Sequence, residues 1–165
     1  MISLNISDST IEDDLDQKDI QAILSNFNGL KSFLLTSSDI IFIEKNAFSG
    51  VPSLEELNLS GNSKLAQLDL ASMPHLTTIN LMNDIQLSSL KLSDLPKLNS
   101  KSIKFEKNQK LSHISLNGLP GLVELNTHDI GNKESLSLDI SNCTNLHTLN
   151  ADRSNLVKLH LEDVD

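Results

Sequence analysis

Residues 54–96 read LEELNLSGNSKLAQLDLASMPHLTTINLMNDIQLSSLKLSDLP and pass twice through one repeated pattern. Each copy splits into two half-turns of similar length. The first half-turn, from Leu54 to Asn62, has the form L-x-x-L-x-L-x-x-N. The second half-turn has another pair of leucines in the order L-x-L, followed by an apolar residue directly before Pro74. Side chains two positions apart lie on the same face of a strand. Each half-turn therefore predicts one short strand whose leucines point inward.

The pattern continues through the rest of the chain. The cores of the first half-turns start at Leu57, Ile79, Ile103, Leu125 and Leu149, and those of the second half-turns at Leu68, Leu90, Ile114, Leu138 and Leu159. Extra residues fall in connecting turns, at Asn99–Ser100 and at residues 131–134. A fixed period in the range of roughly 20–29 residues, built on this motif, is the signature of a leucine-rich repeat. We therefore expect an α/β solenoid of mostly β coils, each of about 22 residues with two parallel strands.

The chain is expected to be a single domain with three parts. Residues 1–29 form a first unit, in which alternation over residues 2–7 predicts a strand and Asp13–Asn28 predicts a helix. Residues 30–53 form a second unit with a strand at Lys31–Thr36, and residues 54–165 form the regular two-strand coils. The sequence stops at a repeat boundary with no polar cap, so we expect it to be a fragment of a longer protein.

Aligning the half-turns distinguishes two kinds of corner. Five residues after the core start, the first set has a mostly polar column of Asn62, Asp84, Asn108, Ile130 and Ser154, and the second set has an apolar column of Met73, Leu95, Leu119, Cys143 and Val164. We expect the polar side chains to satisfy backbone groups buried at the turn, because such groups are costly when unpaired. Cys143 is expected to be a small buried residue and not a nucleophile.

The outward side chains of the first half-turns form the candidate binding surface. The candidate partner-binding residues are Glu56, Asn58, Ser60, Thr78, Asn80, Met82, Lys104, Glu106, Glu124, Asn126, His128, Asn150 and Asp152. The alternative interpretation is that the stacked Asn side chains hydrogen-bond one another along the sheet. That alternative gains weight because the chain has no Trp or Tyr, the residue types that tend to dominate binding energy. The outward side chains of the second half-turns are small and polar, which is typical of a solvated surface.

Composition and motifs exclude several classes of function. The formal net charge of -9 disfavours nucleic acid, which requires clustered Lys and Arg on one face. No apolar run approaches the length of a membrane span. The five histidines have no paired ligand spacing, and no nucleophile motif or phosphate loop is present. We therefore expect no catalytic residues, no metal and no cofactor, and a monomer that does not insert into a membrane.

The two alternating half-turns, and above all NCTNLHTLNADRSNLVKLHLED at residues 142–163, resemble bacterial surface leucine-rich repeat proteins. Internalin-like proteins, with repeats of about 21–22 residues, are the nearest of these. The resemblance covers about residues 30–165, while IEKNAFSGVPSLEELNLS at residues 43–60 is also similar to repeats of animal receptors. It implies a concave strand face that binds a ligand, and a location at the cell surface or outside the cell.

The function expected from this evidence is non-catalytic recognition of a protein or glycan through the outward face of the first strands. The alternatives are a structural spacer in a large surface protein, or the targeting domain of an enzyme whose catalytic part is absent. The opening segment, MISLNISDST, has neither the charged nor the apolar region of a signal peptide. A cytoplasmic location is therefore the alternative to the cell surface.

Leu81→Asp tests the predicted register. Leu81 is predicted to point inward, and an unpaired charge is very costly to bury, so the variant should unfold several coils. The measurement is the melting temperature by circular dichroism. A melting temperature equal to that of the wild type would show that Leu81 is not an inward position.

Overall fold

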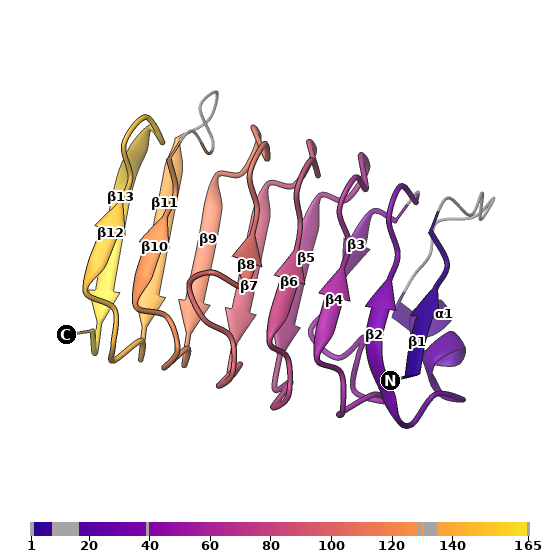
Figure 1. The fold of residues 1–165 in the computed structure, drawn as a ribbon. Helices are drawn as coiled ribbons and strands as arrows, with labels where there is room; N and C mark the ends of the chain where they lie inside the picture. Colours follow the sequence, from indigo (N-terminus) through magenta and orange to yellow (C-terminus); the bar gives the residue numbers. More distant parts are fainter. Residues whose placement is uncertain (1, 8–16, 39, 129, 131–134, 165) are drawn as a thin grey trace.

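The structure, a computed structural model, describes residues 2–7, 17–38, 40–128, 130 and 135–164. Its coils stack along one axis, with one short helix beside the N-terminal end and the two chain termini at opposite ends (Figure 1). The predicted solenoid with parallel strands is confirmed.

On one side of the solenoid, the strands of the first half-turns are short. These strands, which we call the first strand set, are β1 (Ile2–Asn5), β2 (Leu30–Leu34), β4 (Glu56–Asn58), β6 (Thr78–Asn80), β8 (Ile103–Lys104), β10 (Glu124–Asn126) and β12 (Thr148–Asn150). Their pairings are all parallel. They nevertheless form two separate sheets, one of five strands in the order β1-β2-β4-β6-β8 and one of two strands, β10-β12.

The second strand set forms the opposite side and is continuous. It comprises β3 (Phe42–Ile43), β5 (Gln67–Ala71), β7 (Ser89–Ser93), β9 (His113–Asn117), β11 (Leu136–Ser141) and β13 (Leu156–Glu162). These strands form one six-stranded parallel sheet in the order β13-β11-β9-β7-β5-β3. Leu68, Leu90 and Ile114 are aligned across it as the repeat predicts. One side of the solenoid is therefore interrupted between β8 and β10, while the other is not.

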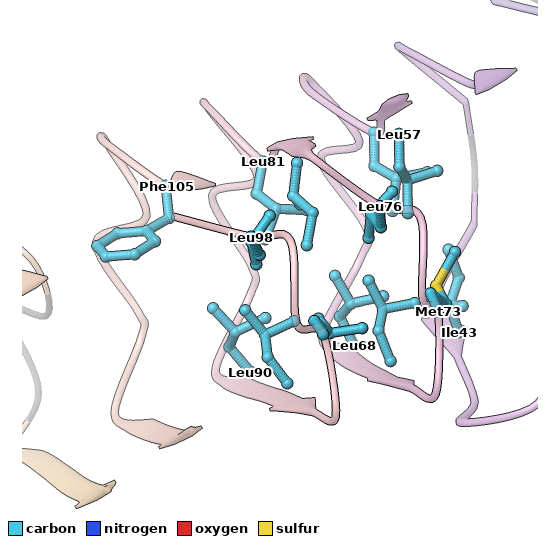
Figure 2. Close-up of a cluster of buried hydrophobic side chains, with 14 of the residues drawn as sticks. Ile43, Leu57, Leu68, Met73, Leu76, Leu81, Leu90, Leu98 and Phe105 are labelled. Atoms are coloured by element: carbon cyan, nitrogen blue, oxygen red, sulfur yellow. The ribbon is translucent and has the colours of Figure 1, made fainter. Parts of the chain in front are cut away.

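The core lies between the two strand sets. Figure 2 shows Leu57 and Leu81 from one side facing Leu68 and Leu90 from the other, and all four are at most 1% exposed. Burial follows the alternation that the sequence predicts, as in β7, where Leu90 and Leu92 are buried and the residues between and beside them are not. Burying aliphatic side chains of this size stabilises the fold by about 1.5–3 kcal/mol each.

The N-terminal end carries the helix α1 (Gln17–Leu24). Ile20 and Leu24 are buried at 1% and 0% exposure and pack on the core. The predicted helix spans residues 13–28. Its first four residues lie outside the described part of the chain, and it ends at Leu24, earlier than predicted. The reason is a tight turn, because the Phe27 N–H bonds to the Leu24 carbonyl and the Leu30 N–H bonds to the Phe27 carbonyl, which leads the chain into β2.

The predicted polar column holds the coils in register. Asn62 Oδ1 accepts the Ser38 N–H at 2.7 Å, Asp84 Oδ1 accepts the Asn62 N–H at 2.7 Å, and Asn108 Oδ1 accepts the Asp84 N–H at 2.8 Å. We call Asn62, Asp84 and Asn108 the polar ladder. All three are 0% exposed, so each satisfies a backbone group that has no access to water. The next position of the column is Ile130, which has no acceptor, and the ladder ends there.

The residue before each ladder position has a left-handed backbone. Gly61 has φ 77°, Asn83 has φ 65° and Lys107 has φ 68°. This conformation suits Gly but costs other residues roughly 1–2 kcal/mol. After Gly61 and Asn83 it turns the next backbone N–H toward the acceptor of the adjacent coil.

Asp84 is the one acid in the ladder. Its side chain is fully buried, and its Oδ2 atom has no hydrogen-bond partner among the described residues. Desolvation by burial raises the pKa of Asp84 to about 8, against the lowering effect of the N–H groups of Asn62 and Gly61. The raised pKa means that the carboxyl is largely protonated near neutral pH.

Asp84→Asn should remove a pH dependence of stability. Because the pKa in the folded state lies above the unfolded value of 3.8, the contribution of Asp84 is fully present below about pH 4 and is lost as pH rises through about 8. At pH 8 the Asn variant should be more stable by a few kcal/mol, and at pH 4 the difference should shrink. Denaturant unfolding at both pH values measures this, with the exposed Asp139→Asn as control. Equal slopes with pH for wild type and Asp84→Asn would contradict the account.

Candidate functional site

The outward face of the first strand set is the surface that the sequence singles out. Aligned pairs include Asn58 with Asn80, Asn80 with Lys104, and Asn126 with Asn150. Most of the outward side chains on β4 and β6 are half-buried. From β8 onward the candidate side chains are exposed, namely Lys104, Glu106, Glu124, Asn126, His128, Asn150 and Asp152. The C-terminal half of this face therefore offers the more accessible polar groups.

The Asn side chains of this face bind their own backbone. The Oδ1 atoms of Asn5, Asn58, Asn80, Asn126 and Asn150 each accept the N–H of the residue two positions later, at 3.0–3.1 Å. This pattern is an Asx-turn. No hydrogen bond joins two of these Asn side chains among the described residues, so the alternative that they bond one another along the sheet is wrong. Substituting these Asn residues would disturb the turns as well as the surface.

The face is divided between β8 and β10. Across β6 and β8 the Ile79 N–H bonds to the Ser102 carbonyl at 2.8 Å, and the Leu81 N–H bonds to the Lys104 carbonyl at 2.7 Å. No equivalent backbone hydrogen bond joins β8 to β10 within the described part of the chain. The columns predicted from sequence are thus interrupted between Lys104 and Asn126.

A cleft of about 490 Å³ opens at this division. Its lining includes five of the candidate residues, Lys104, Glu106, Glu124, Asn126 and His128. The apolar part of the lining is Ile103, Phe105, Leu122, Leu125 and Ile130. Ile103 is half-buried, whereas the aligned Ile79 is 0% exposed. The cleft therefore exposes part of the core beneath the polar face.

Two local features lie at the division. Ile130 cannot accept the Asn108 N–H, so the ladder supplies no bond at this boundary. The Ser100 hydroxyl, in the two-residue insertion, instead accepts the N–H of Val123 at 2.9 Å and of Glu124 at 2.7 Å. Both signals are visible in the sequence as an irregular column and an irregular spacing, but their consequence depends on pairing between coils.

Gly121 fixes the other end of the same boundary. A Cβ atom placed on Gly121 would lie 2.4 Å from the Leu98 carbonyl oxygen, a distance no side chain tolerates. The two coils are thus in close contact at Leu98 and Gly121 and separated at the strands. The boundary has the shape of a wedge that opens toward Phe105, whose ring points toward the C-terminal side of its coil in Figure 2.

The charges around the cleft are mixed. Lys101 and Lys104 lie on the β8 side, and Glu106 and Glu124 are also exposed. No ion pair involves any of these four among the described residues. His128 lies 3.5 Å from Asp152 through its Nδ1 atom. The cleft therefore presents charged side chains of both signs that form no ion pair with the described residues.

Other features of the described structure are less suited to a site. A second hollow of about 510 Å³ lies at the N-terminal edge of the second strand set, beside the two-residue strand β3. Cys143 is buried, and burial raises the pKa of its thiol, so the predicted role as a small core residue is confirmed. No cluster of three or more His, Cys, Asp or Glu side chains among the described residues is arranged to hold a metal ion. In the same part of the chain, no helix has the length and apolarity to span a membrane.

Comparison with known proteins identifies the repeat. Residues 28–85 match the family model described as leucine rich repeat. The chain has the leucine-rich repeat fold. The model describes leucine-rich repeats in general and does not distinguish internalin-like proteins from animal receptors.

Among solved structures, the leucine-rich repeat coils are similar to a chain in the structure of the Toll–Spatzle complex, described as a molecular hub in Drosophila development and innate immunity. The identity is 21% and the TM-score is 0.39, and the alignment covers 99% of this chain and 27% of that one. The present leucine-rich repeat chain thus spans less than a third of the length of that protein. Comparison with curated protein sequences gave no match.

Ser100→Ala tests the boundary of the cleft. The variant removes the acceptor of two backbone N–H groups, so it should lower the free energy of unfolding by about 1–2 kcal/mol. Denaturant unfolding measures the loss. Ser102→Ala is the matched control, because the described structure gives the Ser102 side chain no hydrogen bond. Equal stability of the two variants would contradict the assigned role of Ser100.

Proposed function

We propose that this leucine-rich repeat domain is a non-catalytic recognition module that binds a partner protein through the outward face of the first strand set. The residues proposed to contact the partner are those exposed around the cleft, Lys104, Glu106, Glu124, Asn126 and His128, with Asn150 and Asp152 beside them. Leucine-rich repeat domains typically bind proteins and are usually non-catalytic.

One observation carries the proposal. The two sides of the solenoid are built from the same repeat, yet only the first strand set is divided, and at its division the half-buried Ile103 lies beside charged side chains that form no ion pair among the described residues. A spacer needs only inward positions and complete sheets, which the second strand set has. The exposed combination of apolar area with polar groups of both signs is typical of a ligand site.

The resemblance to internalin-like proteins supports placing the domain at a bacterial cell surface. A protein is preferred over a glycan as the partner because apolar side chains line the cleft (Ile103, Phe105, Leu122, Leu125 and Ile130). The alternative function is a structural spacer, in which neither sheet face would bind a partner.

Capture of partner proteins from a cell lysate tests the proposed binding surface with two matched variants. The first-face variant is Lys104→Glu/Glu124→Lys, which changes two exposed side chains and keeps the net charge. The control is Lys91→Glu/Asp139→Lys, which makes the same exchange on the second strand set. We expect a protein to be recovered with the wild type and the control and to be at least tenfold reduced with the first-face variant, as quantified by mass spectrometry.

Two outcomes would contradict the proposal. Proteins recovered equally with both double variants would show that the first face is not the binding surface. Recovery of no protein above an unrelated bead control would favour the spacer. Thermal unfolding of both variants checks that each is folded before the comparison is made.

A further inference from the structure

The two strands beside the cleft face each other with open edges. In a parallel strand the N–H and C=O of one residue point to the same neighbour, and consecutive residues alternate. Ser102 and Lys104 use their carbonyls toward β6, so the backbone groups of Ile103 and Phe105 point toward β10. On the other side, Thr127 bonds to Asn150 across to β12.

The backbone groups of Glu124 and Asn126 accordingly point toward β8. The N–H of Glu124 reaches the Ser100 hydroxyl, which agrees with this direction. Beyond that bond, no backbone partner for the open groups of Ile103, Phe105, Glu124 or Asn126 occurs in the described residues. An unpaired strand edge is a template for another extended chain.

The rest of the cleft suits the side chains of such a chain. Side chains of an added strand would alternate between the floor and solvent. The floor is apolar, formed by Ile103, Leu125 and Phe105, and the rim carries Lys101 and Lys104 with Glu106 and Glu124. None of these four charges has an ion-pair partner within the described chain. A complementary segment would place an apolar residue on the floor and charged residues of both signs at the rim.

We propose that the cleft between β8 and β10 binds an extended peptide segment of a partner protein, which adds a strand to the open edge of β8. This inference rests on the proposed recognition function and specifies how the partner is bound. The Ile103 and Phe105 N–H groups donate to the backbone of the segment, in the manner of β-augmentation. An apolar side chain of the segment packs on the floor, and its acidic and basic neighbours pair with the rim.

Ile130→Asn is the decisive variant. At the equivalent position, Asn108 accepts the Asp84 N–H through Oδ1 and donates to the Leu81 carbonyl through Nδ2 at 2.9 Å. An Asn at position 130 would extend the polar ladder by one coil, accepting the Asn108 N–H and donating to the Phe105 carbonyl. The ladder would then draw β8 and β10 together. The variant should therefore melt at a higher temperature and lose the cleft. Ile130→Val is the matched control, because it remains apolar and adds no acceptor.

The probe is a phage-displayed library of short random peptides, selected on the full chain, followed by synthetic copies of the enriched peptides. Binding is measured by fluorescence anisotropy. We expect enriched peptides with an apolar residue between charged residues, an affinity at least tenfold weaker for Ile130→Asn, and little change for Ile130→Val. Bound peptide should also slow hydrogen exchange at the Ile103 and Phe105 amides.

The outcomes separate this inference from the proposed function. Peptides that bind Ile130→Asn as well as wild type, but are lost with Lys104→Glu/Glu124→Lys, would overturn strand addition while supporting recognition by the face. Peptides insensitive to both variants would contradict both. A library that enriches no peptide would overturn the inference alone, since capture of a folded partner tests the function separately. If Ile130→Asn does not fold, protection of the Ile103 and Phe105 amides decides, and unprotected amides in the complex would overturn it.

Discussion

The solenoid depends on buried hydrogen bonds that backbone amides of one coil donate to side-chain oxygens at one corner of the next coil. Asn62, Asp84 and Asn108 each supply one such acceptor in a place that water does not reach. Apolar burial holds the two strand sets together but is not directional, so it does not set the register between coils. In the N-terminal coils the ladder and the backbone pairing of the parallel strands set that register together, and burial in the ladder raises the pKa of Asp84 to about 8.

The candidate site follows from the end of the ladder. The first strand set divides at the coil boundary where the ladder ends at Ile130, while the continuous pairing of β7, β9 and β11 keeps the opposite side whole. The coil boundary is then held by the Ser100 hydroxyl and the contact at Gly121. The coil boundary at which the ladder ends is therefore also the one that leaves strand edges open on the face proposed to bind a partner. We therefore expect an acceptor at position 130 to stabilise the stack and to weaken binding in the cleft.

The sequence predicts the parts that repeat and misses the part that does not. Inward positions such as Leu57 and Leu68, the polar ladder and the alignment of Asn58 with Asn80 all follow from the regular repeat, because each coil meets the same environment. The extra residues at Asn99–Ser100 and the apolar Ile130 are visible as irregularities. Their effect is not predictable from one strand, since whether β8 pairs with β10 depends on bonds contributed by two coils. The use of the Asn side chains within their own turns is likewise hidden, because alternation gives a direction and not a partner.

Amide hydrogen exchange by NMR tests the central claim most directly, since it compares bonded and open positions of one sheet in a single sample. The Ile79 and Leu81 amides bond to the Ser102 and Lys104 carbonyls and should exchange slowly, at the rate of larger unfolding events. The aligned Ile103 and Phe105 amides should exchange much faster, because no strand pairs with them. Protection of Ile103 and Phe105 equal to that of Ile79 and Leu81 would show a continuous sheet, and the account of the cleft would then be wrong.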